Sequence, residues 1–180
     1  MRQPGGARVP ETLPEPPFEI LEQTGWSRRP DGGALGPWRA GVVDGMLWLL
    51  PSRMTPQAFA EGSAIWREAM LPLPGGSAGA YWLAHALRQD VWRAYRGLPG
   101  ALPMVAVSAE PLPATNPGTG LAARRVLLGM FSPGRGQLPG ERLSAVLENQ
   151  GLARHLTWAA RKAGSGVRPS RAARPGGTPA

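Results

Sequence analysis

Residues 38 to 51 read Trp-Arg-Ala-Gly-Val-Val-Asp-Gly-Met-Leu-Trp-Leu-Leu-Pro, and this stretch decides the fold of the chain. Asp44-Gly45 separates two runs of apolar and β-branched residues. An Asp-Gly pair suits a type I′ turn, because both central residues of that turn need positive φ. The stretch therefore predicts a β-hairpin. Its second strand is apolar on both faces and ends at Pro51, which indicates a strand in the middle of a covered sheet.

On both sides of the hairpin, apolar residues recur at helical spacing. The pattern predicts five helices, at residues 18–25, 56–71, 78–96, 141–150 and 152–163. Ser77 is the expected N-cap of the third helix, which has the clearest periodicity. Its predicted core stripe consists of Leu83, Leu87, Val91 and Tyr95.

The second predicted helix has a clear start signal, with Thr55 as N-cap and Pro56 at the first helical position. Gly62 and Ser63 weaken its middle. Its expected apolar face consists of Phe59, Ile65, Trp66 and Met70.

Two short apolar runs, at residues 103–109 and 125–131, are bounded by Pro and Gly and predict buried strands. The expected fold class is therefore α/β: a small mixed sheet that contains the hairpin and is covered by helices. We expect one domain over residues 18–163. Residues 1–17 and the basic tail 164–180 are rich in Pro and Gly, so we expect both to be disordered, the first without a role.

Composition narrows the possible chemistry. The chain of 180 residues has no cysteine and only two histidines, His85 and His155, which argues against disulfides, thiol nucleophiles and Cys-ligated zinc. We expect no cofactor and no bound metal, and our first expectation is that the protein is not an enzyme. The sequence has no apolar run of the roughly 20 residues that a membrane span needs, and the first ten residues lack the apolar core of a signal peptide. The expected location is the cytoplasm.

The net charge of +8 is concentrated at one end of the chain. Up to Gly120, ten arginines balance ten acids, whereas from Leu121 onward nine arginines and one lysine face two glutamates. No acid follows Gln150. Such a block attracts polyanions by counterion release. The alternative interpretation is that the preference for arginine over lysine reflects a GC-rich genome and that the tail is merely solubilising.

The basic residues form two candidate binding sets, each with an aromatic residue. The first lies on the last predicted helix and in the tail: Arg154, Trp158, Arg161, Lys162, Arg168, Arg171 and Arg174. On that helix, Leu152, Leu156, Ala159 and Ala160 are expected on the opposite face. The second set lies beside His85 on the 78–96 helix: Arg88, Trp92 and Arg96. A tryptophan framed by arginines can stack on a base, but it also arises when a half-buried ring is flanked by snorkelling arginines.

Three kinds of partner suit a cationic amphipathic helix with one aromatic residue: a nucleic-acid backbone, an anionic membrane, or an acidic protein groove. The last two predicted helices also have helix-turn-helix dimensions. The sequence favours a non-catalytic nucleic-acid-binding protein, with DNA ranked before RNA. The alternative is an interaction or assembly factor whose basic end docks on an acidic protein, and an active nuclease ranks third.

The pattern from residue 38 to about residue 147 resembles the nuclease-related domain family, whose core is restriction-endonuclease-like. The resemblance is carried by WRAGVVDGMLWLLPSR (38–53), AYWLAHALRQDVWRAY (80–95), LPMVAVSA (102–109), VLLGMF (126–131) and LPGERLSAVL (138–147). Members of that family carry an Asp at the start of the hairpin and a Glu-x-Lys at the end of its second strand, and these residues hold a divalent metal and activate water. Here Arg39 and Pro51-Ser52-Arg53 stand near those positions, which implies a copy without catalytic activity. Asp44, the one acid of the hairpin, is explained by the turn.

Overall fold

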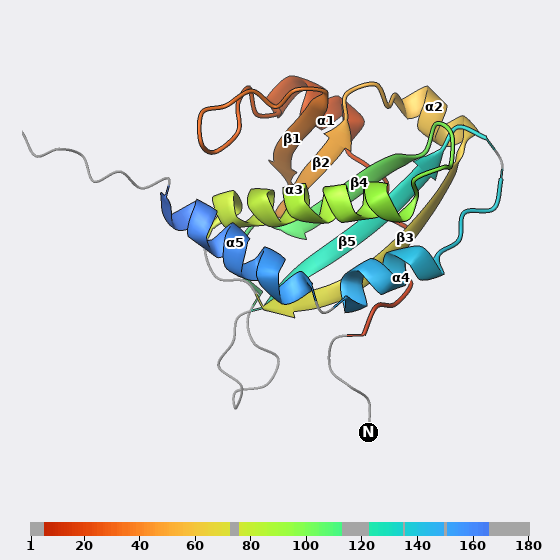
Figure 1. Ribbon diagram of the computed structural model, residues 1–180. Helices are drawn as coiled ribbons and strands as arrows, with labels where there is room; N and C mark the ends of the chain where they lie inside the picture. The colour runs from red at the N-terminus through yellow and green to blue at the C-terminus, as the bar shows by residue number, and fades with distance from the viewer. Residues whose placement is uncertain (1–5, 73–75, 113–122, 135, 150, 166–180) are drawn as a thin grey trace, which may run out of the picture.

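The computed structural model describes residues 6–72, 76–112, 123–134, 136–149 and 151–165, and its centre is a five-stranded sheet (Figure 1). Along the sheet the strand order is β1-β2-β4-β5-β3. The strands are β1 (Trp38–Val43), β2 (Met46–Pro51), β3 (Ser63–Pro72), β4 (Leu102–Ser108) and β5 (Ala123–Ser132). Every pair of neighbouring strands is antiparallel. The α/β class is confirmed, and the sheet is antiparallel where a mixed sheet was expected.

The predicted hairpin is confirmed in position and turn. Val43 pairs with Met46, and the two residues between them have positive φ, 50° at Asp44 and 74° at Gly45. These are the conditions that a two-residue type I′ connection requires. β2 lies between β1 and β4, and five of its six residues are buried, as expected for a strand covered on both faces.

The long helix α3 (Ser77–Ala94) joins β3 to β4 across the sheet. Both strands are antiparallel to β5, so they run parallel to one another with β5 inserted between them. This arrangement is a split β-α-β unit. The predicted stripe of α3 is confirmed, since Leu83, Leu87 and Val91 are completely buried. Ser77 is the first helical residue, and Gly76 occupies the cap position in its place.

The sheet divides the core in two, and helices cover both of its faces (Figure 1). On one face lie α3, α4 (Glu141–Glu148) and α5 (Leu152–Ser165). The other face packs against α1 (Phe18–Thr24) and α2 (Pro56–Glu61), whose rings Phe18 and Phe59 are 5.7 Å apart. None of the helices in the described ranges is both long and apolar enough to cross a membrane.

The helix predicted over residues 56–71 is wrong beyond Glu61. Thr55 caps α2 as expected, accepting a hydrogen bond from the Ala58 N–H at 3.1 Å, but the helix ends at Gly62. From Ser63 the chain is β3, which pairs with β5 over ten consecutive residues. Ten ladder pairs outweigh a weak helical preference in this segment, because its middle holds Gly-Ser and the β-formers Ile65 and Trp66 follow after one alanine.

The segment before α1, expected to have no role, lies against the edge of the sheet from residue 6 onward. Arg8 and Glu68 exchange both backbone hydrogen bonds, at 2.9 and 2.7 Å, so Arg8 extends the sheet beyond β3. Pro10 and Pro16 are buried as the segment continues toward α1. One bridged residue thus covers the middle of an otherwise free strand edge. The predicted tail 164–180 begins inside α5, and its residues 166–180 lie outside the described part of the chain.

Candidate nucleic-acid interface

Helix α5 packs on α3 and thereby sorts its own side chains into two faces. Ala159 is completely buried, and Leu152, Leu156 and Ala160 pack against the core beneath it. The exposed polar and aromatic side chains of α5 are Arg154, Thr157, Trp158, Arg161 and Lys162. The predicted division of the helix is confirmed, and no acid lies between residues 152 and 165. The basic face is therefore fixed to a rigid support.

Trp158 is held at one side and open at the other. Its ring meets Trp82 edge to face, with centroids 5.6 Å apart, and lies nearly parallel to His85 at 6.3 Å. Even so, 37% of the residue remains exposed. A ring that is fixed by two aromatic neighbours and still faces solvent can stack on a base with little loss of side-chain entropy.

Lys162 belongs partly to an internal cluster. Its Nζ lies 5.4 Å from the centre of the Trp82 ring, and the Arg29 guanidinium lies 5.6 Å from the same centre. Arg29 is paired with Asp31 at 2.9 Å. A hydrogen bond from the Gly33 N–H, followed by the Arg29 guanidinium, lowers the pKa of Asp31. Lys162 is thus less available to a ligand than Arg154, which has no such aromatic contact among the described residues.

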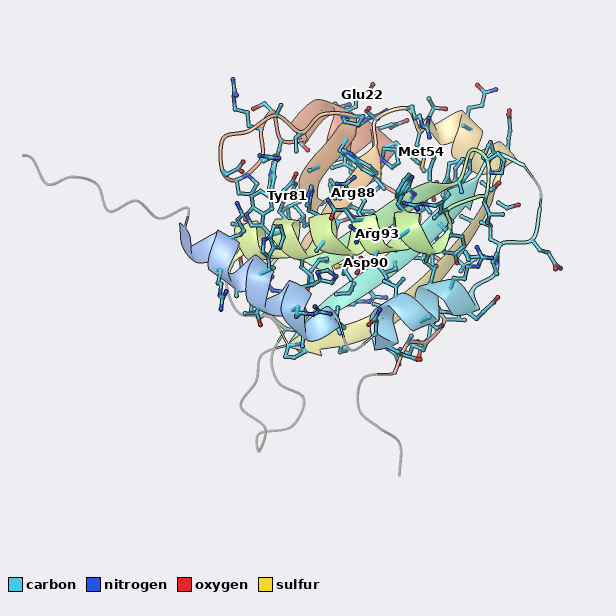
Figure 2. The ribbon with its side chains drawn as sticks, in the orientation of Figure 1. Glu22, Met54, Tyr81, Arg88, Asp90 and Arg93 are labelled. Atoms are coloured by element: carbon cyan, nitrogen blue, oxygen red, sulfur yellow. The ribbon has the colours of Figure 1, made fainter. Side chains whose placement is uncertain are left out.

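The second predicted set does not stay together, because Arg88 turns away from the surface. Arg88 lies on the side of α3 toward β1, and Asp90 lies on the side toward α5 (Figure 2). The Arg88 guanidinium stacks 4.3 Å above the Trp38 ring, and its Nη2 lies 3.3 Å from the Nδ1 of His85. Its Nε is buried without a hydrogen-bond partner in the described part of the chain. Burial lowers the pKa of Arg88.

Trp92, near the end of α3, and Arg96, just beyond it, remain an exposed pair. Trp92 is 54% exposed, and the Arg96 guanidinium lies 5.3 Å from its ring centre. This is the geometry of a surface ring shielded by a cation. Of the first set, Arg168, Arg171 and Arg174 lie outside the described residues. The described candidates are therefore the exposed face of α5 and a separate pair at the end of α3, Trp92 and Arg96.

An aromatic cluster around His85 was not predicted from the sequence. The His85 ring lies between Tyr81 and Trp158, at 6.2 and 6.3 Å, and Trp26 reaches Tyr81 from the loop before β1. Burial, followed by the charges of Arg88 and Arg29, lowers the pKa of His85 to about 4. The imidazole is therefore neutral at pH 7. Tyr81, Trp82 and His85 share helical spacing in the sequence, but nothing there indicates that Trp158 joins them.

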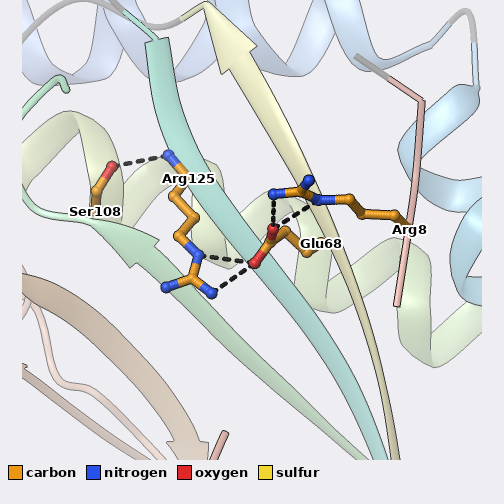
Figure 3. Close-up of polar contacts among 4 residues, drawn as sticks. All are labelled: Arg8, Glu68, Ser108 and Arg125. Carbon is orange, nitrogen blue, oxygen red and sulfur yellow. Dashed lines mark hydrogen bonds and ion pairs between the residues drawn. The ribbon is translucent and has the colours of Figure 1, made fainter. Parts of the chain in front are cut away.

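The structure also holds a buried carboxylate that sequence reasoning missed. Glu68 is 3% exposed and accepts hydrogen bonds from Arg8 and Arg125 on its two oxygens (Figure 3). Burial acts to raise the pKa of Glu68, but the bonds from Arg125 and Arg8 together hold that pKa below its usual value. The three charges join the N-terminal segment, β3 and β5. Both carboxylate oxygens are engaged by arginines, so the arrangement serves the fold.

The positions that matter for the nuclease resemblance hold a tethered arginine. Arg39 Nη2 donates to the Ser52 carbonyl at 2.5 Å and to the Met54 carbonyl at 3.1 Å. A guanidinium has no lone pair to offer a metal ion. Asp44 lies in the turn with positive φ, the role expected from its sequence. Within the described ranges, no three His, Asp or Glu side chains gather in a way that could hold a metal ion.

No protein-family model, curated protein or solved structure matches this chain.

Proposed function

We propose that this protein binds nucleic acid without catalysis and contacts phosphates through the exposed face of α5 and the basic sequence that follows it. The observation that carries the proposal is the pairing of exposed cations with a half-exposed ring on an anchored helix, where Arg154 and Arg161 flank Trp158 and Ala159 is fully buried. Cations supply the affinity for phosphates, and the ring supplies a stacking surface.

The proposal ranks DNA before RNA and includes a cytoplasmic location and descent from a nuclease-related domain that has lost its metal ligands. The tethered Arg39 supports the last point, because a cation now stands near a position where that family carries an acid. Seven basic residues are assigned to the surface. Four of them lie in the described part of the chain: Arg154, Arg161, Lys162 and the separate Arg96. The other three, Arg168, Arg171 and Arg174, are assigned from the sequence alone.

The test is fluorescence anisotropy with labelled duplex DNA, single-stranded DNA and RNA across a salt series. Engagement of about four to six duplex phosphates gives a log–log slope of roughly −4 to −5. The double substitution Arg154→Gln and Arg161→Gln should flatten that slope by about two units, since two counterions fewer are released. The matched control is Arg28→Gln with Arg53→Gln, which removes the same charge from exposed positions outside α5.

The ring is tested separately. Trp158→Ala should weaken the affinity for single-stranded DNA about tenfold and the affinity for duplex DNA much less, because only an unpaired base can stack on the Trp158 ring. Trp92→Ala is the comparison, since Trp92 is also exposed and flanked by an arginine. A loss with Trp92→Ala alone would place the interface on α3. No binding of any nucleic acid at low salt would overturn the proposal and favour an acidic protein partner.

A further inference from the structure

A second concave surface lies between α3 and α4, outside the proposed interface on α5. It is a shallow groove of about 500 Å³, and its lining residues are Asp90, Arg93, Ala94, Arg142, Ala145, Val146 and Asn149. Ala94, Ala145 and Val146 give it an apolar floor. Its polar lining consists of two guanidiniums, one amide and one carboxylate. The charged groups come from two helices, so their relative positions are set by the packing of α4 on α3.

Arg142 enters the groove as a positioned cation. Its Nη1 donates to the Ala94 carbonyl at 3.1 Å, and its guanidinium lies 5.6 Å from the centre of the Tyr95 ring. Tyr95 is itself fixed by the hydrogen bond that its hydroxyl donates to the Pro139 carbonyl at 2.5 Å. Among the described residues, no carboxylate forms a salt bridge with Arg142. A guanidinium that is already ordered loses little entropy when an anion binds.

Both oxygens of the one carboxylate in the groove, Asp90, already have a partner. Asp90 Oδ1 accepts from Arg93 at 2.8 Å, and Asp90 Oδ2 lies 2.5 Å from the Nε2 of His155. This arrangement orients Arg93 and leaves its remaining N–H groups for a ligand. Asn149 is oriented as well, because its Oδ1 accepts from the Gly151 N–H at 2.8 Å. The amide NH₂ of Asn149 is then the end that can donate into the groove.

From this geometry we infer that the α3–α4 groove is a phosphate-binding site, formed by Arg93, Arg142 and the Asn149 amide. The three donors line one groove and come from α3, from the first turn of α4 and from the residue that caps the end of α4. A planar carboxylate is satisfied by a single bidentate arginine, whereas a phosphate group has enough oxygens to accept from several directions at once. The inference goes beyond the proposed function, since nucleic acid on α5 does not require the groove. Free phosphate and the phosphate of a nucleotide share this chemistry.

Asn149→Asp is the most informative substitution. Aspartate keeps the Oδ1 that accepts from the Gly151 N–H, so the start of α5 is preserved, but it replaces the donating amide by a negative charge. Arg142→Gln removes the positioned guanidinium. Arg142→Lys retains the charge without the fork and serves as a second variant if the first folds poorly. Arg53→Gln, an exposed change elsewhere, is the control.

The measurement is a titration of the ¹⁵N-labelled full chain with inorganic phosphate, followed by NMR at constant ionic strength adjusted with chloride. We expect saturable shifts centred on Ala94, Val146 and Asn149, with at least a tenfold weaker Kd for Asn149→Asp and Arg142→Gln, an intermediate Kd for Arg142→Lys and no change for Arg53→Gln. Unsaturable shifts, shifts centred on α5, or an unchanged Kd in Asn149→Asp would overturn the inference.

A parallel arm uses one oligonucleotide with and without a 5′-phosphate. A preference for the phosphorylated form that Asn149→Asp abolishes would identify a nucleic-acid end as the source of the phosphate, and binding of inorganic phosphate alone would identify a free ion. The Arg154→Gln and Arg161→Gln double variant separates the two proposals. It should weaken oligonucleotide binding and leave the Kd for inorganic phosphate unchanged, so the failure of one proposal is distinguishable from the failure of the other.

Discussion

At the scale of single residues, the charges of this protein differ in how they are compensated. Glu68 is buried and accepts hydrogen bonds from two arginines, whereas the Nε of Arg88 is buried and has no hydrogen-bond partner in the described ranges. The stacking of Arg88 on Trp38 and its contact with a neutral His85 compensate that guanidinium only in part. His85 is affected by both its burial and the charge of Arg88 beside it.

His85 should make the stability of the protein depend on pH in a defined window. Its pKa falls from an ordinary 6.5 to about 4 in the folded chain, since burial and the charges of Arg88 and Arg29 outweigh the opposing effect of Asp31. Between these values the unfolded chain binds a proton that the folded chain rejects, so stability rises with pH across the window and falls as the solution is acidified. The loss through this ring should be about 1 to 2 kcal/mol, less than the full shift implies because the ring is partly solvated.

Urea denaturation at pH 7 and pH 4.8 checks this, with His85→Gln as the comparison. The wild-type protein should lose more stability between the two pH values than the variant does. Asp31 and Glu68 have pKa values lowered from 3.8 and 4.5, so their contribution is lost at lower pH and cancels in the comparison. Equal pH dependence in the two proteins would mean that the ring titrates normally in the fold.

At the scale of secondary-structure elements, local signals were sufficient where one residue determined the backbone. Asp44-Gly45 predicted the hairpin and its turn, and Pro51 predicted its end. Gly62 ends α2, but the local sequence does not show that a strand follows, because the pairing that makes Ser63–Pro72 a strand comes from β5, some sixty residues later. Such long-range pairing leaves little trace in a local window.

The hairpin yields the second stability prediction. Replacing Gly45, with φ of 74°, by valine should destabilise the fold by about 1 to 3 kcal/mol, because a β-branched side chain resists the left-handed region. A chemical denaturation midpoint checks this. Asp44→Asn is the matched change at the neighbouring turn position and should have little effect, since asparagine tolerates positive φ. A Gly45→Val protein with an unchanged midpoint would show that the turn is not held in this conformation.

At the scale of the whole molecule, the sequence predicted the amphipathic division of α5 but not what the helix supports. The sequence placed residues 152–163 inside the domain, but the charge block after Gln150 gave no indication of how much of the core this helix contributes. In the structure, Ala159 is fully buried, and Leu152 and Leu156 pack against the main core. The groove between α3 and α4 was likewise not predictable, since Arg93 and Arg142 are brought together only by the packing of their helices.

Removal of everything after Gln150 should therefore unfold or strongly destabilise the protein rather than merely abolish its binding. The loss would uncover the side of α3 that carries Trp82, now only 4% exposed, and would break the contact between Asp90 and His155. Loss of the buried apolar surface of Ala159, Leu152, Leu156 and Trp158 amounts to several kcal/mol, on the order of the whole stability of a small domain. Thermal unfolding of this truncated chain should show a broad or absent transition together with binding of a hydrophobic dye.

The control is a chain that ends at Ser165, which keeps α5 complete and removes a segment rich in Gly, Pro and Arg that carries no apolar stripe in the sequence. Its melting temperature should match that of the full chain, while its salt-dependent affinity for nucleic acid should fall. A cooperative transition at an unchanged temperature in the chain that ends at Gln150 would contradict the assignment of α5 to the core. Helix α5 would then be an appendage to the core, and nucleic-acid binding could be studied by truncation instead of substitution.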